Sequence, residues 1–77
     1  MNISYLSTFF KDMTGMSPLA YIHKVRLENA KELLLNTELT VETISEKVGL
    51  SNSVALTRLF KKYEGTTPAV YRKRNRR

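Results

Sequence analysis

The 77-residue chain contains no cysteine, no tryptophan and a single histidine, His23. Without cysteine, a disulfide framework, a thiolate zinc site and a Cys/His nucleophilic pair are all excluded. No second group stands ready to act with His23, which we expect at the edge of a helix, and the sequence has no Gly-rich phosphate loop. The sequence therefore predicts no metal, no cofactor, no small-molecule ligand and no enzymatic activity.

Long apolar runs are also missing. No stretch approaches the roughly 20 residues of a membrane span, and the N-terminus MNISYLSTFF lacks the charged start and apolar core of a signal peptide. We expect a protein that does not enter membranes and resides in the cytoplasm. The length allows one small domain, near the lower size limit for an apolar core without a metal or a disulfide.

Acidic residues are scarce in the last third of the chain. Residues 27–46 carry one lysine against five glutamates, whereas residues 47–77 carry nine basic residues against Glu64 alone. Five of the nine lie in the closing RKRNRR. Such a basic end favours a polyanion, with nucleic acid first and an anionic membrane second, although a solvated tail that aids solubility is an equal alternative from charge alone.

The sequence repeats itself fifty residues apart. Residues 4–26 match residues 54–76 at seven of 23 positions: Leu6/Leu56, Phe10/Phe60, Lys11/Lys61, Gly15/Gly65, Pro18/Pro68, Tyr21/Tyr71 and Arg26/Arg76. Each copy predicts an amphipathic helix, a glycine that ends it, a hydroxyl cap and a proline that begins the next helix. The chain therefore contains two related helix-break-helix units.

Apolar spacing predicts helices over about 3–14, 18–36, 41–49 and 53–64, followed by a short basic helix from residue 68. No sustained alternation of apolar and polar residues indicates a strand. The fold class is all-α. The inward residues are expected to be Leu6, Phe9, Phe10 and Met13 in the first helix; Tyr21, Ile22, Val25, Ala30, Leu33 and Leu34 in the second; Val41, Ile44 and Val48 in the third; and Leu56, Leu59, Phe60 and Tyr63 in the fourth. We expect Tyr21 and Tyr71 to anchor the core.

The segment Val48-Gly49-Leu50-Ser51 separates the third and fourth helices and predicts a helix-turn-helix. In this motif the second helix enters the major groove and offers its outward residues to the base edges. The expected base contacts are Ser53, Val54, Thr57 and Arg58, with Arg58 the strongest because a guanidinium can bond guanine O6 and N7 together. The expected phosphate contacts are Ser51, Asn52, Lys61 and Lys62.

Three stretches carry a resemblance to the DNA-binding domain of AraC-family bacterial transcription regulators: SYLSTFFKDMTGMSPLAYI, RLENAKELLLNTELTVETISEKVGLS and LTRLFKKYEGTTPAVYRK. The resemblance implies a homeodomain-like bundle in which two helix-turn-helix units, joined by a long helix, place two recognition helices on DNA. Ser4, Ser7 and Thr8 would then be base contacts of the first recognition helix, and Lys11 a phosphate contact. The implied partner is double-stranded DNA in the bacterial nucleoid.

By this resemblance, residues 1–77 form one DNA-binding domain fragment, truncated at the N-terminus. Its parts are an orphan recognition helix (2–16), a linker helix (17–37), a complete second helix-turn-helix (40–65) and a C-terminal basic helix and tail (67–77). The helices that normally precede the first recognition helix are missing, and its apolar stripe loses their cover. We therefore expect an exposed apolar face at residues 3–13.

A different function remains open from sequence. That apolar face and the acidic linker helix would suit self-association or contact with RNA polymerase, with the basic tail adding only nonspecific DNA affinity. This alternative makes the chain an interaction or dimerisation module.

Overall fold

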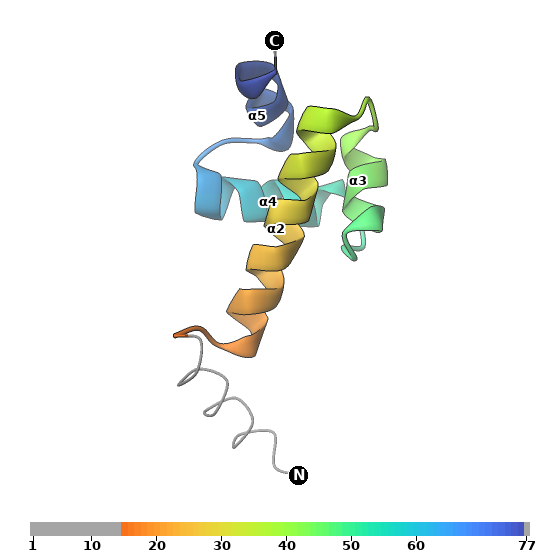
Figure 1. Ribbon diagram of the computed structural model, residues 1–77. Helices are drawn as coiled ribbons and strands as arrows, with labels where there is room; N and C mark the ends of the chain where they lie inside the picture. The colour runs from red at the N-terminus through yellow and green to blue at the C-terminus, as the bar shows by residue number, and fades with distance from the viewer. Residues whose placement is uncertain (1–14, 77) are drawn as a thin grey trace.

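The computed structural model describes residues 15–76, which contain four α-helices and no strand (Figure 1). The helices are α2 (Pro18–Asn36), α3 (Val41–Lys47), α4 (Ser53–Glu64) and α5 (Pro68–Asn75). The predicted all-α fold class is confirmed, and each of these helices lies where its spacing placed it. The helix expected over 3–14 lies outside the described residues.

Hydroxyl caps begin three of the four helices. The side-chain oxygens of Ser17, Thr40 and Thr67 accept hydrogen bonds from backbone N–H groups three residues further on, at 3.1, 3.1 and 3.2 Å. Each bond satisfies one of the N–H groups that a helix start leaves unpaired. Gly65 ends α4 with φ of 71°, the left-handed conformation that glycine adopts without steric cost. The helix starts predicted at Ser17, Thr40 and Thr67 and the helix end predicted at Gly65 are therefore confirmed.

The core lies where α2, α3 and α4 meet. Its buried members are Leu27, Ala30, Leu34, Ile44, Val48, Leu56, Leu59 and Phe60, with Leu33, Leu39, Val41, Leu50 and Tyr71 packed against them. The residues from α4 recur at intervals of three and four, so one stripe of that helix is buried and the opposite stripe faces outward.

Three residues of α2 that were expected inward are on the surface. Tyr21, Ile22 and Val25 are 40 to 44% exposed, so the predictions for these residues, including the core role of Tyr21, are wrong. The first half of α2 projects beyond the bundle formed by α3, α4 and α5 (Figure 1). The buried residues of α2 begin at Leu27 and are Leu27, Ala30 and Leu34.

Tyr63 of α4 is also exposed, contrary to expectation. Phe60 and Pro68 fill the core at this end of α4, and the ring of Tyr71 packs edge-on against Phe60 with centroids 5.4 Å apart. Tyr63 lies on the surface, where the Lys62 ammonium sits 5.3 Å from its ring centroid. The core role expected of Tyr71 agrees with its packing against the cluster.

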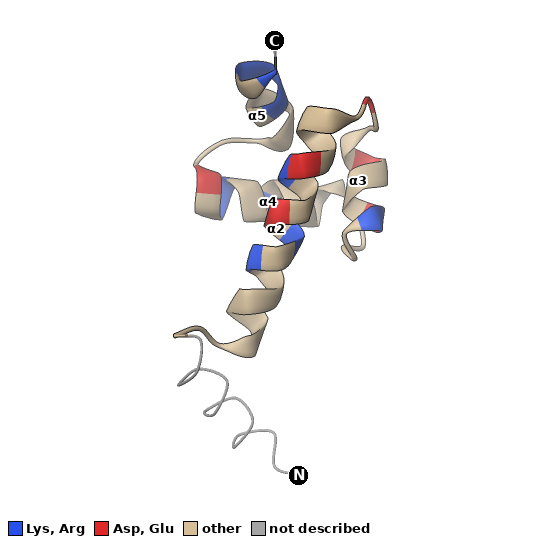
Figure 2. Cartoon of the chain, viewed as in Figure 1, with Lys and Arg blue, Asp and Glu red and all other residues tan. Residues whose placement is uncertain are grey.

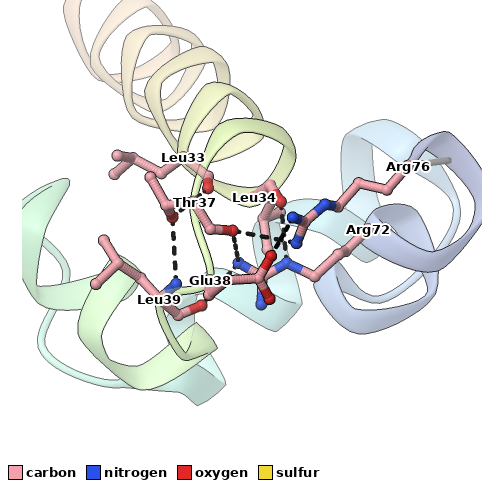
Figure 3. A network of polar contacts seen from close by, with 7 residues as sticks. All are labelled: Leu33, Leu34, Thr37, Glu38, Leu39, Arg72 and Arg76. Atoms are coloured by element: carbon pink, nitrogen blue, oxygen red, sulfur yellow. Dashed lines mark hydrogen bonds and ion pairs between the residues drawn. The ribbon is translucent and has the colours of Figure 1, made fainter.

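The carbonyl groups that end α2 are held by Arg72, a residue of α5 (Figure 3). Arg72 Nε donates to the carbonyl of Leu34 at 2.9 Å, and Nη2 donates to the carbonyls of Thr37 and Leu39 at 3.2 and 2.7 Å. A helix leaves its last carbonyls unpaired and slightly negative, so a cation there satisfies both their hydrogen bonding and their charge. The last turn of α2 has no basic residue of its own.

Arg76 adds to the same contact. It donates to the carbonyl of Thr37 at 3.2 Å and pairs with the Glu38 carboxylate, and this pairing holds the pKa of Glu38 below its ordinary value. Two cations of the RKRNRR segment are thus used inside the molecule. The alternative of a solvated tail, left open by the charge alone, does not describe Arg72 and Arg76, because α5 turns one face toward the end of α2.

We expect Arg72→Met to lower the free energy of unfolding by about 2 to 3 kcal/mol, because three carbonyls lose a charged donor. For a domain of this size the midpoint of thermal unfolding would fall by roughly 10 to 20 °C. Lys73→Met, on the exposed side of the same helix, is the control and should change little. A difference under about 0.5 kcal/mol for Arg72→Met would show that this contact does not stabilise the fold.

Candidate nucleic-acid interface

A tight turn joins α3 to α4. Gly49 has φ of 93°, which an L-residue with a side chain rarely adopts, and its N–H donates to the carbonyl of Glu46 at 3.1 Å. The N–H of Leu50 donates to the carbonyl of Ser45 at 2.8 Å, so the turn folds back on the end of α3. Val48 is buried and Leu50 is half-buried, and both join the core. These contacts form the helix-turn-helix that the sequence predicted.

Ser45 occupies the contact between α3 and the rest of the core. Its side chain is fully buried, and its hydroxyl donates to the carbonyl of Val41 one turn earlier at 2.8 Å. A buried hydroxyl is tolerated when it is hydrogen-bonded in this way, and its small size keeps the helices close. α3 packs against α4, the second helix of the motif.

The outward stripe of α4 contains all the residues predicted to face DNA in this helix. Val54, Arg58, Lys61 and Lys62 are exposed, and Ser53 and Thr57 are half-buried beside them. Positions 54, 58 and 61 recur at intervals of four and three, so they lie along one face of the helix. The structure therefore brings together a hydroxyl-bearing, partly apolar and basic surface over about three turns.

Asn52 and Ser51 lie at the start of this surface. The side-chain oxygen of Asn52 accepts from the N–H of Ala55 at 3.0 Å and so caps α4. Its amide NH2 group is the part that stays available to a phosphate, a distinction that the sequence did not give. Ser51 is exposed in the turn. The other predicted contacts, Ser4, Ser7, Thr8 and Lys11, lie outside the described residues.

Lys31 of α2 holds the far end of α4. It pairs with Glu64 at 2.8 Å and with Glu28 at 3.4 Å, and its ammonium also lies 5.9 Å from the ring centroid of Tyr71. The hydrogen bond that Lys31 donates to Glu64 raises the pKa of Lys31 above its ordinary value, and burial partly opposes this. Lys31 therefore connects α4, α5 and the linker helix.

A groove separates α2 from the outward face of α4. Its lining is His23, Leu50, Ala55, Arg58, Leu59 and Lys62. His23 is half-buried, as expected of a residue at the edge of its helix. The groove places α2 next to the two cations Arg58 and Lys62, which stand one turn apart on α4.

Charges of both signs are interspersed on the bundle. Figure 2 shows acidic and basic residues on α2, α3 and α4, whereas the charged residues of α5 are all basic. Among residues 15–76, no three His, Cys, Asp or Glu side chains gather closely enough to hold a metal ion. None of the described helices is both long and apolar enough to cross a membrane.

Comparison with known proteins places the fold and the motif in one family. A family model described as a helix-turn-helix domain matches residues 1–74. The chain is 42% identical over 69 residues to YobQ, an uncharacterised helix-turn-helix transcriptional regulator of Bacillus subtilis, a match that covers 90% of this chain and 29% of that protein. The chain thus spans less than a third of the length of that relative.

Two solved structures share the architecture. The C-terminal domain of AraT, a response regulator from Geobacillus stearothermophilus, superposes with a TM-score of 0.95 at 36% identity, over 100% of this chain and 64% of that one. The DNA-binding domain of AdpA, a global transcriptional factor solved with a target DNA, gives a TM-score of 0.92 at 28% identity, over 96% and 67% of the two chains. This chain belongs to the AraC-type family of helix-turn-helix domains.

The Lys31–Glu64 pair contributes to the free energy of unfolding by an amount that depends on pH. Because the folded-state pKa of Lys31 is raised, its contribution is complete below the unfolded-state pKa of about 10.4 and is lost as the pH rises through the folded value. We expect Lys31→Met to cost about 1 kcal/mol at pH 8, and the gap to wild type to close above about pH 10.5. Denaturant unfolding across this range measures it.

Lys24→Met, which removes an exposed lysine from the same helix, should show no such gap. A gap for Lys31→Met that stays constant up to pH 11.5 would mean that packing of the lysine stem, and not its charge, accounts for the loss.

Proposed function

We propose that this domain binds double-stranded DNA at a preferred sequence, with α4 in the major groove, and thereby takes part in the regulation of transcription. The observation that carries the proposal is the outward face of α4, where exposed Arg58 stands among Ser53, Val54 and Thr57 on a helix braced by α3. AdpA, whose structure resembles this one, was solved bound to a target DNA. A helix of this kind fits the width of the major groove.

Each residue of this face has a distinct role in the proposal. Arg58 donates two parallel hydrogen bonds to guanine O6 and N7, Val54 contacts a thymine methyl, and Ser53 and Thr57 bond to base edges. Ser51, Asn52, Lys61 and Lys62 hold phosphates on either side and set the register of the helix. The corresponding roles of Ser4, Ser7 and Thr8 at bases, and of Lys11 at a phosphate, rest on the repeat and the family.

The proposal also covers the cellular location of the domain and a protein partner. A DNA-binding regulator acts in the bacterial cytoplasm at the nucleoid, and the exposed glutamates of α2 and α3 offer a surface for contact with RNA polymerase. No catalytic step is assigned to the domain, because its relatives are transcriptional regulators.

The test begins with selection of bound sequences from a random DNA pool, followed by affinity measurements on the preferred site. We expect Arg58→Ala to weaken binding to that site by about 5- to 150-fold, the equivalent of 1 to 3 kcal/mol for a bidentate contact. It should also relax the preference for one guanine. Binding to unrelated DNA should change far less, because phosphate contacts dominate there.

Arg74→Ala, an exposed arginine of α5, is the matched control and should leave the base preference unchanged. If Arg58→Ala retains both the preferred sequence and the affinity, α4 is not the recognition helix.

Self-association is the second candidate function, and the exposed apolar side chains of α2 favour it. Leu19 is 62% exposed, and Ile22 and Val25 lie exposed on the same half of the helix. The apolar face expected at residues 3–13 lies outside the described residues. An apolar area of this kind on a small domain often marks a protein contact.

Light scattering at rising protein concentration tests this candidate. We expect the mass to move from monomer toward dimer, and Leu19→Gln to shift that transition to higher concentration, whereas Val70→Gln on α5 leaves it unchanged. A monomer at every concentration up to about 1 mM would exclude a stable dimer, since that limit corresponds to roughly 4 kcal/mol of association.

A further inference from the structure

Arg26 is a cation of α2 that the helix-turn-helix motif does not include. Its guanidinium lies directly against the turn between α3 and α4: a Cβ at Gly49 would stand 3.4 Å from Arg26 Nε, 3.5 Å from Nη2 and 3.7 Å from Cζ. These are ordinary van der Waals distances, so the guanidinium packs on the turn, and the φ of 93° is what favours glycine at position 49. Arg26 is half-buried in this position.

Arg26 differs from the other half-buried cations of the bundle. Arg72 and Arg76 bond to the end of α2, and Lys31 pairs with two glutamates. Arg26 forms no hydrogen bond or ion pair with any residue in the described range. A guanidinium has five N–H donors, and those of Arg26 reach solvent, because no side-chain nitrogen or oxygen of the described residues is both buried and unpartnered. An anionic ligand can therefore bind them.

The surroundings of Arg26 indicate which anion that is. His23, one turn earlier on α2, lines the groove shared with Arg58 and Lys62 of α4. Arg26 itself lies on the turn that leads into α4. This part of α2 therefore borders the outward face of α4 beside its start, where a DNA backbone passes when that helix is in the major groove.

We infer that Arg26 is a phosphate contact contributed by the linker helix, which makes the DNA interface a surface of three helices. The inference rests on the proposed function. Its guanidinium, stacked on the turn, binds one phosphate oxygen or two beside the N-terminus of α4. The contact fixes the position of the motif on the backbone and carries no base preference.

Counterion release makes this role measurable. Each neutralised phosphate contributes about 0.9 to the slope of log affinity against log salt concentration. We expect Arg26→Gln to reduce that slope by about 0.9 and to weaken binding roughly 5- to 10-fold at 0.1 M salt, equally on preferred and unrelated DNA. Arg26→Lys, which keeps the charge, should recover most of the slope.

Lys24→Gln is the matched control. It removes one positive charge from an exposed position two residues away, on the opposite side of α2, and should leave the slope unchanged. Thermal unfolding of Arg26→Gln, Arg26→Lys and Lys24→Gln distinguishes a loss of binding from a loss of stability. If the role of Arg26 were purely structural, Arg26→Gln would lower the unfolding midpoint and leave the slope of log affinity against log salt concentration unchanged.

A slope for Arg26→Gln equal to that of wild type overturns the inference while leaving the proposed function in place, provided that Arg58→Ala still loses the preferred site. Wild-type protein that binds no DNA at low salt overturns both.

Discussion

The contact between Arg72 and the end of α2 is the constraint on which the arrangement of the other helices depends. The carbonyls of Leu34, Thr37 and Leu39 span the last turn of α2 and the connection into α3, and one guanidinium bonds to all three. Because the connection is held at both ends, α3 starts in a fixed direction at Thr40. The turn at Gly49 then sets α4 relative to α3. The direction of the proposed recognition helix thus also depends on a side chain of α5, the helix that follows it.

The same contact determines which basic residues remain available to DNA. The C-terminal run is strongly basic in sequence, yet Arg72 and Arg76 are directed inward to carbonyls and to Glu38. The five basic residues of this run therefore overstate the positive charge that it offers to DNA. The cations that face the proposed interface come instead from α4 and from the middle of α2. Long-range attraction to DNA depends on the total charge, whereas the position on DNA depends on the cations at the interface.

The local features of the fold could be predicted from the sequence because each depends on residues close together in the chain. Caps, helix-ending glycines and N-terminal prolines located α2 and α5, and apolar spacing identified the buried and outward stripes of α4. Spacing could not show which part of an apolar face finds a neighbour, so Tyr21, Ile22 and Val25 were misplaced. The contacts of Arg72, Lys31 and Arg26 join residues 20 or more apart in sequence, so no local sequence pattern predicts them.

The central claim is that α4 recognises bases in the major groove through Arg58. Methylation interference on the selected site tests it most directly, because dimethyl sulfate modifies guanine N7 in the major groove and adenine N3 in the minor groove. The account predicts that N7 methylation of one guanine blocks binding by the wild-type protein and has no effect on the residual binding of Arg58→Ala. Interference confined to adenine N3, or the same guanine pattern for both proteins, would contradict it.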